Sequence, residues 1–287
     1  MLLFLLLLVH LATASSMYHG TDFIMKKFTL YCELIPELSC QWHDDILVVD
    51  YLPEKPMDQL WVFGEHARER ITSEIAFRVI NDIINMKPSH RITIIPVLNV
   101  WGRKQVDRGD TCLRKNENGV DTNRNYQVDN THSYPRGSEE YEGPHPLSEK
   151  ESKLVSTLLL SGVQRYINIH SGEYSMYMPY DSDTSTPPNL NEMTHFLNTL
   201  KPLCPQCAEG SAAVVSSYKA FGTSVDYAIK NGVPEAYTFE VFGSTDYSCE
   251  KMFNPVNYDE FVDVTNMWKK ILMATVIDES LSQTPTI

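Results

Sequence analysis

The chain has 287 residues, with 37 acidic and 24 basic side chains and a formal net charge of -13 at pH 7. This acidic balance argues against a nucleic-acid partner, because binding to phosphates needs clustered lysine and arginine. Hydrophobic residues form 43% of the chain, an ordinary share for a soluble globular protein, and no repeat or low-complexity stretch divides it. We therefore expect a single folded domain.

The chain begins with the apolar run MLLFLLLLVHLA, which is too short to cross a bilayer. The run leads into Ala12-Thr13-Ala14, the small-residue pattern of a signal-peptide cleavage site. We interpret residues 1–14 as a signal peptide, with an N-terminal anchor or a buried helix as the alternatives. Residues 15–287 then form the domain, which we expect to be secreted or to lie in the lumen of the secretory or lysosomal pathway, without a membrane partner.

Short apolar or β-branched runs alternate with helical patterns along the rest of the chain. The runs predict strands at residues 61–63, 92–98, 166–169 and 237–239. Apolar residues at helical spacing predict helices over residues 73–86, after the capping-box pattern formed by Ser148 and Glu151, and over residues 261–272. This alternation is typical of an α/β domain whose sheet is mainly parallel and covered by helices.

Each predicted strand leads directly into unusual polar residues. The first is followed by residues 65–69 (EHARE), the second by Asn99, the third by His170 and the fourth by Glu240. In open α/β sheets, binding sites form beyond the carboxyl ends of the strands. We therefore expect these side chains to converge on one crevice.

This crevice contains a candidate metal-ligand set. His66 and Glu69 are three residues apart, so on a helical turn they face the same way. Zinc hydrolases commonly use two histidines, one carboxylate and a water, which makes His170 the candidate third ligand. A histidine three residues from a glutamate is frequent by chance, and a lone His170 is more typical of a partly buried structural histidine. The set gains weight only from the motifs around it.

Those motifs, taken in chain order, resemble the zinc metallocarboxypeptidase family of the carboxypeptidase A and B type. The matching pieces are HARE at 66–69, RKN at 114–116, GVDTNRNY at 119–126, IHS at 169–171, Pro179-Tyr180, Tyr218 and TFE at 238–240. The GVDTNRNY stretch and the spacing of Tyr218, Asp226 and Glu240 are the specific parts. The resemblance implies a mixed, mainly parallel central sheet of about eight strands flanked by helices on both faces.

The resemblance also implies a role for each matching side chain. His66, Glu69 and His170 correspond to the ligands of one zinc ion. Glu240 corresponds to the general base that activates a zinc-bound water, and Arg114 to the group that stabilises the carbonyl oxyanion. Asn123, Arg124 and Tyr218 correspond to the clamp for the substrate's terminal carboxylate. Arg68 corresponds to a residue of a neighbouring subsite, and Asp121 to the partner of a histidine ligand.

The implied function is a zinc-dependent metallocarboxypeptidase that hydrolyses the C-terminal bond of peptides or proteins. The alternatives are a related zinc amidohydrolase acting on acylated amino acids and a catalytically inactive zinc- or peptide-binding module. Arg124 and Tyr218 favour the peptidase, and Glu240 argues against an inactive module because binding alone needs no base. We expect a monomer, and the short segment before His66 predicts no sizeable propeptide.

Two positions in the pocket that would hold the side chain of the substrate's last residue give opposite predictions of specificity. Counting from His170 places Asp181 at a position that, by resemblance, is acidic in the branch selecting C-terminal Lys or Arg. Counting from Tyr218 places the apolar Val225 at the second such position. A buried carboxylate would strongly favour a cationic side chain, so we lean to basic specificity. If Asp181 is instead a solvated loop residue, apolar or aromatic C-terminal residues are expected.

The even number of cysteines predicts disulfides in an oxidising compartment. Six cysteines permit 15 pairings, so the sequence leaves the connectivity open. Cys32 with Cys40 and Cys204 with Cys207 are candidate local pairs. The second pair also has metal or redox spacing, but a loop disulfide is favoured because no second CxxC completes a four-ligand site.

Overall fold

The structure, a computed structural model, describes residues 17–126, 133–246 and 248–277. The predicted signal peptide, residues 1–14, lies outside these ranges. The strands are β1 (Leu38–His43), β2 (Ile46–Tyr51), β3 (Met57–Phe63), β4 (Arg91–Ile95), β5 (Arg165–His170), β6 (Tyr174–Met178), β7 (Ala208–Ser211) and β8 (Glu235–Val241). The helices are α1 (Thr21–Leu34), α2 (Arg70–Met86), α3 (Val100–Asp107), α4 (Lys150–Leu159), α5 (Leu190–Leu200), α6 (Ala212–Val215), α7 (Ser224–Lys230), α8 (Cys249–Phe253) and α9 (Tyr258–Ile277), with short 3-10 turns η1 (Thr122–Arg124) and η2 (Lys201–Leu203).

The strands of the described residues form one eight-stranded sheet in the order β1-β2-β4-β3-β5-β8-β6-β7. The four predicted strands are its centre, β4-β3-β5-β8, and all four run parallel. The outer strands make the sheet mixed, because β2 runs antiparallel to β4 and β1, and β6 runs antiparallel to β8. The predicted fold class, a mixed and mainly parallel sheet of about eight strands, is confirmed.

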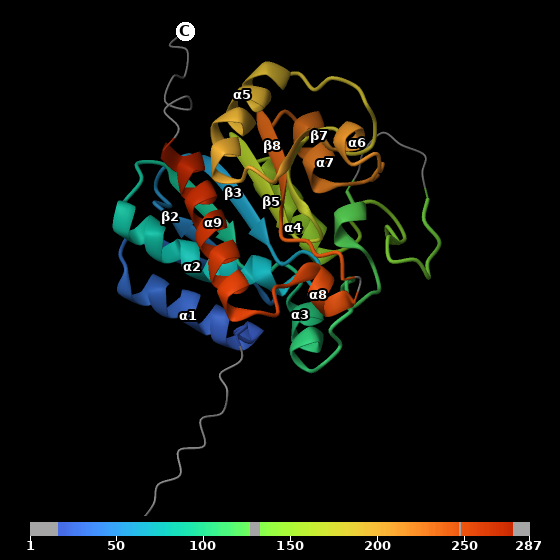
Figure 1. The fold of residues 1–287 in the computed structure, drawn as a ribbon. Helices are drawn as coiled ribbons and strands as arrows, with labels where there is room; N and C mark the ends of the chain where they lie inside the picture. The colour runs from blue at the N-terminus through green and yellow to red at the C-terminus, as the bar shows by residue number, and fades with distance from the viewer. Residues whose placement is uncertain (1–16, 127–132, 247, 278–287) are drawn as a thin grey trace, which may run out of the picture.

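Helices cover both faces of this sheet, as the central strands' side chains show. Asn168 of β5 pairs with Thr238 of β8, so the two share a face, and the next residue, Phe239, lies on the opposite face. Asn168 donates to Ser224 of α7, whereas Phe239 packs on Trp268 of α9. Therefore α7 and its neighbour α4 lie on one face, and α9 and its neighbour α2 on the other (Figure 1). Within the described ranges, no helix combines the length and apolar character needed to cross a membrane.

Several element boundaries differ from the predicted ones. The second predicted strand stops at Ile95 because Pro96 follows and has no N–H for the ladder. The capping-box prediction is wrong, since α4 begins at Lys150 and Ser148 does not cap it. The Ser148 hydroxyl instead accepts from Asn125 and donates to Glu149.

The six cysteines form three disulfides: Cys32–Cys40, Cys112–Cys249 and Cys204–Cys207. The first and third are the local pairs that the sequence suggested. The second joins residues 137 apart in the sequence and ties the loop before Arg114 to the start of α8.

Candidate active site and metal centre

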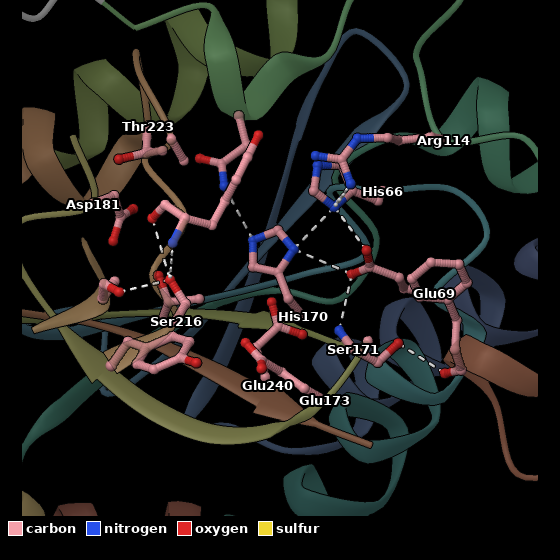
Figure 2. Close-up of a pocket in the computed structure, with 18 of the residues that line it drawn as sticks. His66, Glu69, Arg114, His170, Ser171, Glu173, Asp181, Ser216, Thr223 and Glu240 are labelled. Atoms are coloured by element: carbon pink, nitrogen blue, oxygen red, sulfur yellow. Dashed lines mark hydrogen bonds and ion pairs between the residues drawn. The ribbon is translucent and has the colours of Figure 1, made fainter. Parts of the chain in front are cut away.

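A cavity of about 360 Å³ lies at the carboxyl ends of the central strands (Figure 2). The loop after β3 supplies His66, β5 ends at His170, and β8 carries Glu240, which lies directly beside His170 in the sheet register. The predicted site residues that line the cavity are His66, Glu69, Arg114, Asn123, Arg124, His170, Asp181, Tyr218 and Glu240. The structure therefore brings together residues from well-separated parts of the chain. Of the polar residues that follow the predicted strands, His66, Glu69, His170 and Glu240 line the cavity. Asn99 does not, because its side chain caps α3 by accepting from the Gly102 amide.

The candidate ligands form a tight buried cluster. His66 and Glu69 lie in the turn between β3 and α2, where the Glu69 amide donates to the His66 carbonyl at 3.2 Å. Glu69 Oε1 is 2.7 Å from Nδ1 of His66, and Glu69 Oε2 is 3.1 Å from Nδ1 of His170. The two Nδ1 atoms are 3.1 Å apart. Two imidazole nitrogens and one carboxylate thus converge on one point.

This arrangement fits one zinc ion. Zinc–nitrogen bonds of about 2.0–2.1 Å in a tetrahedral site place neighbouring ligand atoms about 3.3 Å apart. The observed separations of 2.7, 3.1 and 3.1 Å are close to that spacing. A pair of imidazoles with one carboxylate is also a standard donor set of catalytic zinc. The residues present therefore match the metal in both chemistry and spacing.

A carboxylate lies behind the first histidine. Asp121 Oδ1 is 3.1 Å from Nε2 of His66, and Asp121 Oδ2 accepts from Arg114 Nε at 2.9 Å and Nη2 at 2.6 Å. Burial by itself would raise the pKa of Asp121, but the Arg114 charge, with His66, holds it well below its usual range. An ionised Asp121 is able to accept a hydrogen from Nε2 of His66, an arrangement that would leave Nδ1 available to a metal.

Glu240 projects from β8 into the cavity, where Figure 2 shows it beside Glu173 and below His170. Its Oε2 has no hydrogen-bond partner in the part of the chain that the structure describes. Burial raises the pKa of Glu240 to about 8, an effect opposed by His170 and reinforced by Glu69. A carboxyl group with a free oxygen and a pKa near neutrality is suited to exchange protons with a substrate.

A buried guanidinium lies at another wall of the cavity. Arg124 Nη1 donates to the Asn123 carbonyl at 2.9 Å and Nη2 to the Tyr218 hydroxyl at 3.5 Å. Arg124 Nε has no partner among the residues described. Asn123 is oriented by Ser224, whose amide donates to Asn123 Oδ1 at 3.0 Å. An arginine with an unused N–H beside a tyrosine hydroxyl is suited to bind a carboxylate.

Two glutamates of residues 133–146 contact the substrate-binding candidates. Tyr218, which is about half exposed, donates to Glu140, and Arg68 donates from Nη1 to Glu139 Oε2 at 2.8 Å. Arg68 also stacks on Phe253, with its guanidinium carbon 4.3 Å from the ring centroid. Arg68 is not among the residues that line the cavity, although Phe253, on which it stacks, is.

The structure separates the two candidate specificity residues. Val225 is fully buried in α7 and does not line the cavity, whereas Asp181 does. Figure 2 shows Asp181 and Thr223 on the side of the cavity opposite Glu69. Burial, together with the charge of Asp226, raises the pKa of Asp181 to about 7. Of the two candidate specificity residues, Asp181 is therefore the one that brings a carboxyl group to the cavity.

Sequence reasoning missed other residues of the cavity wall. The Ser171 amide donates to Glu69 Oε2 at 3.0 Å, and its hydroxyl donates to the Phe253 carbonyl at 2.8 Å. The position of Ser171 next to His170 could have suggested this role. No sequence signal pointed to Phe253, because its place depends on the distant Cys112–Cys249 disulfide that anchors α8.

Comparisons with known proteins point to one family. A model of the zinc carboxypeptidase family matches residues 58–262. Carboxypeptidase B of Rattus norvegicus is 30% identical over 214 residues, which is 62% of this chain and 50% of the relative. Carboxypeptidase A6 of Homo sapiens is 31% identical over 166 residues, 52% of this chain and 38% of the relative. The chain thus spans half or less of the length of these relatives.

Solved structures share the fold. Bovine thrombin-activatable fibrinolysis inhibitor, in complex with tick carboxypeptidase inhibitor, superposes with a TM-score of 0.79 at 22% identity and covers 91% of this chain and 98% of that one. Carboxypeptidase A from Helicoverpa armigera has a TM-score of 0.77 at 19% identity, covering 93% and 75%. Since the family model spans most of the described domain, this chain belongs to the zinc carboxypeptidase family.

Proposed function

We propose that this chain is a metallocarboxypeptidase that holds one zinc ion and removes the last residue of a peptide or protein. The observation that carries the proposal is the cluster of His66, Glu69 and His170 in one cavity with Arg124, a buried arginine with an unused N–H among the described groups. A metal-ligand set near an anion-binding guanidinium matches a substrate that presents a scissile carbonyl close to a free carboxylate.

His66, Glu69 and His170 would hold the metal, and Asp121 would keep His66 in the tautomer that offers Nδ1. Zinc, when bound, supplies Lewis acidity for the carbonyl and for water. The rest of the chemistry falls to the chain's own side chains, which must move protons, stabilise charge and position the peptide.

Glu240 is the proposed general base. In its ionised form Glu240 accepts a proton from the attacking water at Oε2 and passes it to the nitrogen of the leaving amino acid. Arg114 is the proposed electrostatic partner of the reacting carbonyl oxygen. Its Nε and Nη2 are anchored on Asp121, while Nη1 points toward His66 at 3.3 Å and can donate to the oxygen as negative charge develops.

Arg124, Asn123 and Tyr218 are the proposed clamp for the terminal carboxylate. Planar guanidinium groups bind carboxylates in a bidentate manner, and the hydroxyl of Tyr218 lies 3.5 Å from Arg124 Nη2. Arg68 is the proposed contact for a residue further along the peptide, next to Phe253, on which its guanidinium stacks.

Asp181 is the proposed selector of C-terminal Lys or Arg, because it is the acidic group on the wall opposite the ligands. Val225 is expected to act only through packing, since its side chain is fully buried. We also propose that the protein works outside the reducing cytosol, which the three disulfides support.

A peptide panel that differs only in the last residue tests the proposal. The purified protein should release that residue, and a zinc chelator should abolish the release until zinc is added back. Acylated amino acids should react far more slowly than peptides with a free carboxylate. Chelator-insensitive release, or faster turnover of acylated amino acids, would contradict the peptidase assignment.

The base has its own test. Glu240→Gln should keep the bound zinc but lower kcat by about a thousandfold, because proton transfer from water is lost. Glu173→Gln is the matched control, since Glu173 is a neighbouring carboxylate of the same cavity with no assigned proton to move. Equal losses in both variants would show that negative charge in the cavity, rather than a base at Glu240, sustains turnover.

A further inference from the structure

Glu65, the residue before His66, is a buried carboxylate next to the three candidate metal ligands. Its residue exposure is 1%, and it does not line the cavity. Gly64 produces this placement, because its φ of 66° turns the chain after β3, and a Cβ there would lie 3.2 Å from Cα of Val97. Burying an ionised carboxylate is costly unless it is paired. The position of Glu65 therefore calls for a partner.

The contacts of Glu65 identify that partner. Glu65 Oε2 accepts from Asn168 Nδ2 at 2.6 Å and lies 3.4 Å from Nε2 of His170. Glu65 Oε1 has no hydrogen-bond partner among the described residues. Asn168 and the neighbouring Tyr126 can each supply only a neutral donor, so His170 is the neighbour through which a bound metal would offset the charge of Glu65.

The hydrogen-bonding options of His170 lead to the same pairing. Its Nδ1 faces Glu69 and His66, so a metal there requires Nδ1 to be unprotonated and Nε2 to carry the hydrogen. The groups near Nε2 are Glu65 Oε2 at 3.4 Å and Asn123 Nδ2 at 3.5 Å. The amide of Asn123 cannot accept this hydrogen, because its oxygen is already turned toward the Ser224 amide.

We propose that Glu65 is a positioning residue for the zinc ligand His170. It accepts the Nε2 hydrogen, fixes the tautomer and ring orientation, and increases the basicity of Nδ1. This inference rests on the proposed zinc site. Glu65 would then act on His170 as Asp121 acts on His66, with one difference. Asp121 also forms an ion pair with Arg114, whereas the donor beside Glu65 is the neutral amide of Asn168. The negative charge of Glu65 therefore acts mainly on the histidine.

Zinc affinity of the full chain tests the proposal. Glu65→Gln keeps the side-chain shape and removes the charge, and it should weaken zinc binding about 10–100-fold in competition with a chromophoric chelator. Glu74→Gln is the matched control, because Glu74 is fully buried and lies 2.9 Å from Nδ1 of His19, outside the cavity. It should bind zinc within about twofold of wild type. Equal affinities of the two variants would overturn the proposal.

A second measurement covers the case in which Glu65→Gln does not fold, as judged by urea unfolding of the metal-free proteins. Proton–nitrogen NMR of the zinc-loaded wild type should show His170 protonated at Nε2, with that proton downfield and slow to exchange. A His170 protonated at Nδ1 would overturn the proposal. If the zinc site itself is wrong, the wild type will not bind stoichiometric zinc. That result would contradict both the proposed function and the role of Glu65, and it is distinct from a loss confined to the Glu65 variant.

Discussion

The charge on Asp181 should decide which C-terminal residue the cavity prefers, and that charge should change near neutral pH. Asp181 is only 7% exposed. Burial and the neighbouring carboxylate of Asp226 raise the pKa of Asp181 to about 7, while Thr223, Arg124 and His170 act in the opposite direction. The carboxyl is therefore mostly neutral at pH 6 and mostly ionised at pH 8.

The size of the effect follows from that pKa. A group with a pKa of about 7 is about 9% ionised at pH 6 and about 91% ionised at pH 8, a tenfold change. The side chains of Lys and Arg stay cationic over this range, and only the ionised Asp181 attracts them. The ratio of kcat/KM for a peptide ending in Lys to kcat/KM for one ending in Leu should therefore rise with pH, by up to about tenfold or 1.4 kcal/mol.

The assay measures both peptides in one series of buffers between pH 6 and 8. Taking the ratio cancels the titration of Glu240 and of the metal site, which both substrates share. Asp181→Asn is the matched control, because the amide keeps the size of the side chain without its charge. Its ratio should be flat with pH and should favour Leu. A flat ratio in the wild type, or an equal slope in the variant, would refute the role of Asp181.

Two more predictions concern stability and access to the clamp. Replacing Cys112 and Cys249 by serine should lower the free energy of unfolding by about 5 kcal/mol, because this disulfide closes a loop of 137 residues. Replacing Cys204 and Cys207, which are only three residues apart, should lower the free energy of unfolding by about 2 kcal/mol. Urea unfolding that finds the larger loss for Cys204–Cys207 would contradict the estimate. Glu140→Gln should weaken the exposed hydrogen bond that holds Tyr218 and lower KM about twofold to fivefold without changing kcat, whereas an unchanged KM would show that this contact does not compete with substrate.

The central part of the sheet could be predicted because its strands are buried on both faces. Such strands are almost continuous apolar runs, like residues 92–95 of β4 and 166–169 of β5, and their pattern does not depend on distant residues. The outer strand β2, with the sequence ILVVDY, is buried in the same way and was missed although its apolar run is as clear. Other outer strands carry weaker signals. Strand β7 has the sequence AEGS, with no apolar alternation, and it pairs only because the edge of β6 is next to it.

The composition of the site could also be predicted, but its geometry could not. Strand ends and motif order pointed to several residues that line the cavity, such as His66, His170 and Glu240, because parallel strands deliver their carboxyl ends to one edge. They did not point to Phe253, and two of the residues that they suggested, Arg68 and Val225, do not line it. Counting along the chain could not tell that Val225 faces the core, since the orientation of α7 is set by its packing on β5 and β8. The Cys112–Cys249 pairing had no local signal because the two residues meet only in the folded chain.

The effect of Asp181 on specificity depends on a second charge in the cavity, that of Arg124. Arg124 lowers the pKa of Asp181, so the proposed clamp and the proposed selector act on each other across one pocket. A C-terminal Lys or Arg would pair its carboxylate with Arg124 and its side chain with Asp181, leaving neither charge buried alone. An apolar C-terminal residue would satisfy Arg124 but bury Asp181 without a partner, which favours the protonated carboxyl. The same cavity can thus accept either class of residue, with pH setting the balance between them.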